Sequence, residues 1–118
     1  MTEERRKTPR IRVYLPLRMS QGEMSQVIET LTKDLGSAGL RCLSQNACPV
    51  STQMRLELIL SASQEPLSVR GRVVWFRTIP QSDQFDLGIA FLEMPAQDER
   101  RLSGYLSILP EQANRIPA

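Results

Sequence analysis

Alternation of apolar and polar residues runs through most of the chain and predicts a protein built mainly from β-strands. From residue 11 to residue 19 every second side chain is apolar, and the positions between carry arginine, tyrosine or proline. A period of two is typical of a strand with one buried face. The same alternation recurs over 53–60, 67–76 and 85–92, and residues 40–43 predict one more short strand. Pro16 has no amide hydrogen to donate, so it indicates an edge or a bulge in the first strand.

Residues 24–35 fit two patterns. Apolar side chains recur there at helical spacing, but residues 27–32 also alternate in the manner of a strand. Local spacing slightly favours the helix. We nevertheless predict a strand, because every clear neighbour is a strand and sequential elements tend to pair.

A terminal helix is predicted over residues 97–109. Apolar side chains recur at helical spacing there, at Leu102, Tyr105, Leu106 and Leu109, and prolines at 110 and 117 are expected to end the helix. Four apolar residues on the outward side of the last two strands would otherwise form an exposed patch. These are Val74, Phe76, Ala90 and Leu92. We predict that the helix covers them.

Six strands and one helix in a chain of 118 residues predict a small antiparallel β-barrel. Closure into a barrel would leave no exposed sheet edges. We assign residues 1–12 to a flexible basic arm, residues 11–110 to one domain that comprises the barrel and its helix, and residues 111–118 to a tail.

The charge of the chain is unevenly placed. The net charge is only +2, too small to favour bulk nucleic-acid binding, but five of the fifteen basic residues lie between Arg5 and Arg12. The N-terminus is charged, and no stretch approaches the ~18 apolar residues of a membrane span. We therefore expect a cytoplasmic protein in which Cys42 and Cys48 are two free thiols, with a bridge between them as the alternative.

The residue inventory argues against an enzyme. The chain has no histidine, which removes the commonest general base and a common metal ligand. We find no cluster of metal ligands, no activated nucleophile and no suitably spaced pair of carboxylates. No catalytic residue, metal site or cofactor is predicted.

Two short motifs carry a family resemblance. Residues 4–11, Glu-Arg-Arg-Lys-Thr-Pro-Arg-Ile, resemble the RxxxR motif that opens PilZ domains, and residues 34–40, Asp-Leu-Gly-Ser-Ala-Gly-Leu, resemble the family's second motif, D/N-x-S-x-x-G. Residues 71–75 and 87–91 are similar to the family's fifth and sixth strands. The ordered set covers nearly the whole chain. It implies a PilZ-like split barrel that binds cyclic di-GMP and relays the second messenger to an effector protein, in motility, pilus, biofilm or exopolysaccharide control.

The chemistry of the arm suits that ligand, which has two phosphates and two guanines. Arginine presents a planar fork that can meet a phosphate or the edge of guanine through two hydrogen bonds, and it can stack on a base. We expect Arg6 and Arg10 to wrap one face of the nucleotide, with charge added by Arg5. The resemblance also implies that the residue at position 5 bears on whether one nucleotide or an intercalated pair binds.

The second motif supplies complementary groups. Asp34 is an acceptor, so its natural partner is the N1–H and N2–H₂ edge of guanine. Ser37 offers a hydroxyl, and Gly36 and Gly39 let backbone amides approach the ligand closely. Gly36, however, stands where the motif has serine, and a shift of one residue turns a strand side chain to the other face. Losing a hydrogen bond to a charged group costs about 1.5–3 kcal/mol, which lowers affinity roughly tenfold to a hundredfold.

Other interpretations stay open. The basic residues 5–12 could form a solvated tail, and residues 34–39 an ordinary turn. Because of Gly36, the domain could be a degenerate PilZ module that binds only protein. A barrel that binds single-stranded nucleic acid is a third hypothesis, but aromatic residues make up only 5% of the chain. Trp75 is in phase with Val69 and Val73, which favours the core over a stacking role against guanine.

Overall fold

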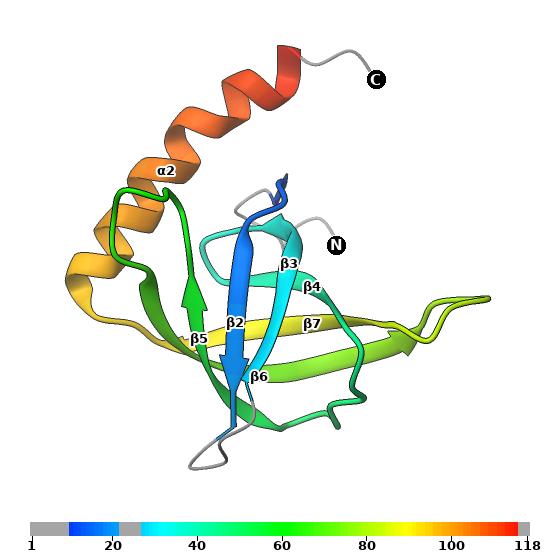
Figure 1. Ribbon diagram of the computed structural model, residues 1–118. Coiled ribbons are helices and arrows are strands. Elements are labelled where there is room, and N and C mark those ends of the chain that lie inside the picture. The colour runs from blue at the N-terminus through cyan, green and yellow to red at the C-terminus, as the bar shows by residue number, and fades with distance from the viewer. Residues whose placement is uncertain (1–9, 22–26, 116–118) are drawn as a thin grey trace, which may run out of the picture.

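The computed structural model describes residues 10–21 and 27–115, with side chains as far as residue 108 (Figure 1). This part of the chain forms seven strands and one helix. In order these are β1 (Ile11–Arg12), β2 (Pro16–Ser20), β3 (Val27–Leu35), β4 (Gly39–Ser44), β5 (Gln53–Leu58), β6 (Leu67–Thr78), β7 (Phe85–Glu93) and α2 (Ala96–Arg115).

Six of the strands form a closed antiparallel barrel. Its strands follow the order β3-β2-β5-β6-β7-β4, and pairing between β3 and β4 closes the ring. The two-residue strand β1 is the seventh and pairs with the end of β3, beyond β2. The prediction of a mainly β fold, a small antiparallel barrel with a C-terminal helix, is confirmed.

The predicted first strand is interrupted at residues 13–15, between β1 and β2. Pro16 opens β2 opposite Leu31 and donates no ladder hydrogen bond. Thr32 of β3 fills the gap, because its hydroxyl accepts a hydrogen bond from the Leu15 amide (2.9 Å) and donates one to the Val13 carbonyl (2.5 Å). A buried side chain therefore satisfies backbone groups where the regular ladder stops.

The ambiguous stretch is a strand. Val27–Leu35 pairs with β2 on one side and with β4 on the other, whereas residues 24–26 lie outside the described part. A register shift between Thr32 and Asp34 accommodates one extra residue in β3. Pairing on both edges explains why the strand wins over the helix that local spacing slightly favours.

The barrel interior is apolar and contains most of the predicted inward residues. The largest fully buried side chains are those of Leu17, Met19, Leu35, Leu40, Leu56, Leu58, Leu67, Leu87, Ile89, Val73, Thr32 and Cys42. Cys42 and Cys48 are both free and buried, as expected. Burial raises the pKa of the Cys42 thiol to about 12, with smaller contributions from Cys48 and Asp86, so Cys42 is a neutral core residue.

Helix α2 packs against the barrel through its first half. Leu102 is buried, and Tyr105 and Leu106 pack against the core. Near the start of the helix, Asp98 accepts a hydrogen bond from the Ser68 amide (3.0 Å), and Arg101 donates one to the Glu65 carbonyl (2.6 Å). These contacts fix the helix on the start of β6 and on the loop that precedes it.

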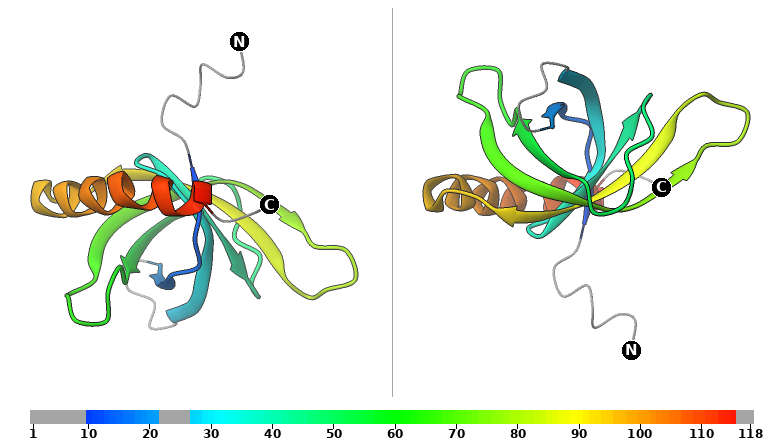
Figure 2. Two further views of the ribbon diagram at one scale, coloured as in Figure 1. Left: turned by 90° about the horizontal axis from the view of Figure 1, so that it is seen from above. Right: turned by 90° about the horizontal axis from the view of Figure 1, so that it is seen from below.

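Two predictions about this helix are corrected. It does not cover the predicted apolar patch, since Val74, Phe76 and Leu92 each remain 40% exposed. For Val74 and Phe76 of β6 the reason is geometric, because α2 and the β6–β7 hairpin extend to opposite sides of the barrel (Figure 2). Leu92 lies closer to the helix and lines a cavity with Leu102, but it stays exposed. The helix also continues through Pro110 to Arg115, over residues assigned to a tail. Proline removes one hydrogen bond, but Glu111, Gln112 and Ala113 favour helix. No helix in the described residues is long and apolar enough to cross a membrane.

Candidate ligand-binding site

Asp34 lies on the outer wall of the barrel between two arginines. Its Oδ1 is 3.5 Å from Nη1 of Arg10, and its Oδ2 is 3.1 Å from Nε of Arg41. The Asp34 side chain is only 17% exposed. Within the described residues, neither Oδ1 of Asp34 nor Nε of Arg41 makes a hydrogen bond. The three groups are therefore held together by charge while an acceptor oxygen and a donor nitrogen are left unused.

A tight hairpin places Asp34 beside Arg41. The Gly36 amide donates a hydrogen bond to the Gly39 carbonyl (2.9 Å), and this turn pairs Leu35 with Leu40 and Asp34 with Arg41. Sequence reasoning missed Arg41. The signal was present, because residues 34 and 41 are equally distant from a turn at 36–39 and must face each other in a hairpin.

The same row of the sheet continues from Arg41 to Trp75. Arg41 pairs with Gly88 of β7, and Gly88 pairs with Trp75 of β6. A Cβ at Gly88 would lie 2.2 Å from Nε1 of the indole, so the ring rests directly on the glycine backbone. The prediction that Trp75 belongs to the core is wrong, because a register shift between Val73 and Trp75 changes its phase and leaves it half-buried on the outer wall.

A second carboxylate lies on the neighbouring part of this wall. Asp86 is 4% exposed, and its Oδ1 accepts a hydrogen bond from Nζ of Lys33 (2.9 Å) while Nη2 of Arg77 lies 3.4 Å from Oδ2. Burial alone would raise the pKa of Asp86. The Lys33 hydrogen bond and charge outweigh it, with help from Arg77 and Arg41, and the pKa lies below its usual value.

The wall as a whole carries an excess of positive charge. Four cationic side chains, those of Arg10, Lys33, Arg41 and Arg77, surround the two carboxylates of Asp34 and Asp86. The difference is two positive charges, before any contribution from the basic residues that precede Arg10 in the sequence. An anionic ligand with hydrogen-bond donors fits these groups.

The remaining predicted site residues have separate positions. Arg5 and Arg6 lie outside the described part of the chain. Ser37 is exposed on the turn and lines a cavity of about 240 Å³ between this turn and α2. A Cβ on Gly39 would lie 2.4 Å from the Ile89 carbonyl, so this glycine permits close approach of β4 to β7. Contact of any of these residues with a ligand stays a prediction.

Comparison with solved structures places the fold beside several bacterial proteins. One is the PilZ domain of YcgR from Escherichia coli with c-di-GMP (15% identity, TM-score 0.68; 95% of this chain and 99% of that chain covered). A second is the MrkH–c-di-GMP complex of K. pneumoniae (16% identity, TM-score 0.79; 93% of this chain and 54% of that chain covered). A third is the inhibitor of motility MotI/DgrA of Bacillus subtilis (17% identity, TM-score 0.75; 95% of this chain and 53% of that chain covered). The chain thus spans about half the length of the last two.

Comparison at the level of sequence assigns the family. No curated protein sequence matches the chain. The PilZ domain family, however, matches residues 4–107, which include both short motifs and all seven strands. The chain therefore belongs to the PilZ domain family.

Proposed function

We propose that this protein is a cyclic di-GMP receptor that binds the nucleotide on the outer wall around Asp34 and relays its level to an effector protein. The observation that carries the proposal is the half-buried Asp34 carboxylate, held between Arg10 and Arg41 with one oxygen lacking a hydrogen bond. Membership of the PilZ family supports it, as do the similar folds of YcgR and MrkH in structures with c-di-GMP.

Each group around Asp34 has a chemical counterpart in the ligand. The free acceptor of Asp34 matches the N1–H and N2–H₂ donors of guanine, whereas a phosphate would be repelled by it. The guanidinium groups of Arg10 and Arg41 match phosphate oxygens or the O6 and N7 edge of guanine. Arg5 and Arg6 come five and four residues before Arg10 in the sequence and lie outside the described part, so the charge that they add to the site stays a prediction. Binding would exchange the Asp34 ion pairs for hydrogen bonds to the nucleotide.

Arg41 also bears on the departure from the family motif. Gly36 occupies the position of the motif serine, and Ser37 is on the turn beside α2. Arg41 projects from the strand that follows this turn and has a buried donor nitrogen without a hydrogen bond in the described part of the chain. We assign to Arg41 part of the hydrogen bonding that the serine hydroxyl would otherwise supply.

Isothermal titration calorimetry with cyclic di-GMP tests the proposal. We expect saturable binding by the wild type and at least tenfold weaker binding after Arg6→Ala, Arg10→Ala or Asp34→Ala, because each removes a hydrogen bond to a charged group worth about 1.5–3 kcal/mol. Arg18→Ala is the matched control, since Arg18 lies on β2 and pairs with Glu29 and Glu57. Equal heats from the wild type and the three site variants would refute the proposal.

A second candidate is a PilZ module that binds a protein partner without the nucleotide. Gly36 is the specific observation that favours it. The wild-type protein, shown to be folded by circular dichroism, would then give no heat with cyclic di-GMP at concentrations up to the millimolar range. The ion pairs around Asp34 would in that case be structural, and Asp34→Ala would lower stability without changing any ligand affinity.

A further inference from the structure

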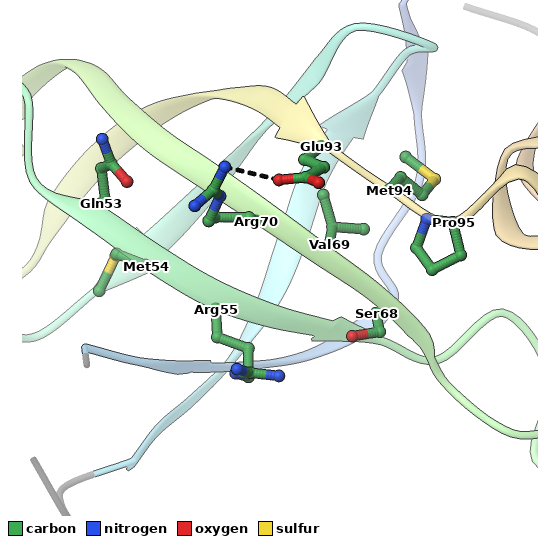
Figure 3. Close-up of a pocket in the computed structure, with 9 residues that line it drawn as sticks. All are labelled: Gln53, Met54, Arg55, Ser68, Val69, Arg70, Glu93, Met94 and Pro95. Carbon is green, nitrogen blue, oxygen red and sulfur yellow. Dashed lines mark hydrogen bonds and ion pairs between the residues drawn. The ribbon is translucent and has the colours of Figure 1, made fainter. Parts of the chain in front are cut away.

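A second basic surface lies on the wall of the barrel opposite Asp34. In the closed ring β3-β2-β5-β6-β7-β4, strand β5 is three places from β4 in either direction, and β6 is three places from β3. A cavity of about 640 Å³ opens there beside β5, β6 and the link from β7 to α2 (Figure 3). Its lining residues are Gln53, Met54, Arg55, Ser68, Val69, Arg70, Glu93, Met94 and Pro95.

The arginines of this surface are poorly neutralised. Arg55 and Arg70 are directly opposite one another in the β5–β6 ladder, and Arg72 follows on the same face. Arg70 reaches Glu93 at 2.5 Å, but this pair is well exposed and binds weakly. Arg55 and Arg72 contact no acidic side chain in the described residues, whereas Arg18 on the adjacent strand has two such partners.

Like charges placed directly across a ladder repel each other. Figure 3 shows the response, because the guanidinium group of Arg70 turns toward Glu93 and that of Arg55 points the opposite way. The juxtaposition of Arg55 and Arg70 gives the isolated domain no electrostatic benefit. A carboxylate supplied from outside would relieve the repulsion between the two arginines.

The rest of the lining indicates the kind of partner. Met54, Met94 and Pro95 offer apolar surface, and methionine adapts its shape to different side chains. None of the nine lining residues is aromatic, so nucleic-acid bases would find no stacking platform there, and Glu93 would repel phosphates. Arginine and methionine are enriched at protein interfaces.

We propose that this surface, defined by Arg55, Arg70, Arg72 and the adjoining cavity, binds an acidic segment of a partner protein, with an apolar side chain of that segment in the cavity. The centre of this surface is Arg55 on β5 and Arg70 on β6, which are three places around the ring from β4 and β3, so the proposal stands whether or not cyclic di-GMP binds. Arg72 lies nearer the nucleotide site, because Ala90 of β7 pairs with both Arg72 and Gly39. A partner could therefore be held at one wall while the ligand is bound at the other.

The test uses the full chain and immobilised heptapeptides that carry Leu, Met or Phe at the centre and zero to four glutamates around it. We expect binding that rises with the number of glutamates, requires the apolar centre, and falls at least tenfold in the double variant Arg55→Gln/Arg70→Gln. Arg18→Gln, on the same outer face but paired with two glutamates, is expected to bind like the wild type.

Three outcomes would overturn the proposal. The first is the absence of binding to any peptide of the set. The second is binding that does not depend on the glutamates or is equally weakened by Arg18→Gln. The third is stronger binding of an oligothymidylate than of the acidic peptides, lost in the same double variant, which would assign the surface to nucleic acid instead. Thermal unfolding of the double variant at the same temperature as the wild type separates loss of binding from loss of fold.

Discussion

Gly39 and Gly104 have opposite surroundings, so the same substitution should have opposite effects. A Cβ at Gly39 would meet the Ile89 carbonyl at 2.4 Å, and backbone cannot move aside cheaply. A Cβ at Gly104 would have no neighbour within 4 Å. We expect Gly39→Ala to lower the free energy of unfolding by about 1–3 kcal/mol and Gly104→Ala to raise it by up to about 1 kcal/mol, because alanine favours helix. Urea denaturation measures both, and equal effects would contradict the close approach of β4 to β7.

Asp86 should make stability depend on pH. Its pKa in the folded protein is lowered, because Lys33 and Arg77 outweigh the effect of burial. A carboxyl group with a lowered folded pKa stabilises the protein fully above the ordinary value of about 4, and this contribution is lost as pH falls through the folded pKa. We expect Asp86→Asn to cost about 1–3 kcal/mol at pH 7 and to flatten the acid dependence of urea unfolding.

The matched control for Asp86 is Asp83→Asn, since Asp83 is exposed on the turn between β6 and β7. It should leave both the stability at neutral pH and the acid dependence close to those of the wild type. If the Asp86→Asn variant retained the full acid dependence of stability, the pairing of Asp86 with Lys33 would not be the cause of that dependence.

At the scale of elements, the break between β1 and β2 depends on one hydroxyl. Thr32 both accepts from the Leu15 amide and donates to the Val13 carbonyl, and it is fully buried. Valine has the same shape without the hydroxyl, so Thr32→Val would leave two buried backbone groups unpaired. We expect a loss of about 1–3 kcal/mol in urea denaturation, against a near-neutral effect for Thr30→Val on the same strand. A loss no larger than that of the control would show that water forms hydrogen bonds with the Leu15 amide and the Val13 carbonyl in the variant.

Local pattern was enough to predict most strands but not their interruptions. The alternation over 53–60, 67–76 and 85–92 corresponds to β5, β6 and β7 because each of these strands has one face in the core. The break before Pro16 is completed by Thr32, sixteen residues away in sequence, which no local pattern reveals. The phase of Trp75 was missed for a related reason, since a bulge depends on the partner strand.

The candidate site likewise contains residues that the sequence predicts and residues that only the fold brings together. Asp34 was found from its motif, and Arg10 from the arm that precedes the barrel. Arg41 follows from hairpin register and was within reach of the sequence. The proximity of Asp86, Lys33 and Arg77 was not, because it requires β3 and β7 to be placed around one barrel.

At the scale of the whole molecule, the barrel presents two charged walls on opposite sides. One carries Asp34 with Arg10 and Arg41, and the other carries Arg55 with Arg70. The apolar side chains of Val74 and Phe76, which α2 leaves exposed, both lie on β6. The proposed nucleotide site and the proposed site for an acidic segment are therefore centred on different strands of the barrel.

Binding of cyclic di-GMP on the wall around Asp34 is tested most directly by titration of ¹⁵N-labelled protein with the nucleotide, followed by two-dimensional NMR. We expect saturable shifts of the Asp34, Arg41 and Gly88 amides and of the indole N–H of Trp75, the chain's single tryptophan, while Arg55 and Arg70 stay unchanged. A spectrum that does not respond to the nucleotide, or shifts confined to the β5–β6 wall, would contradict it.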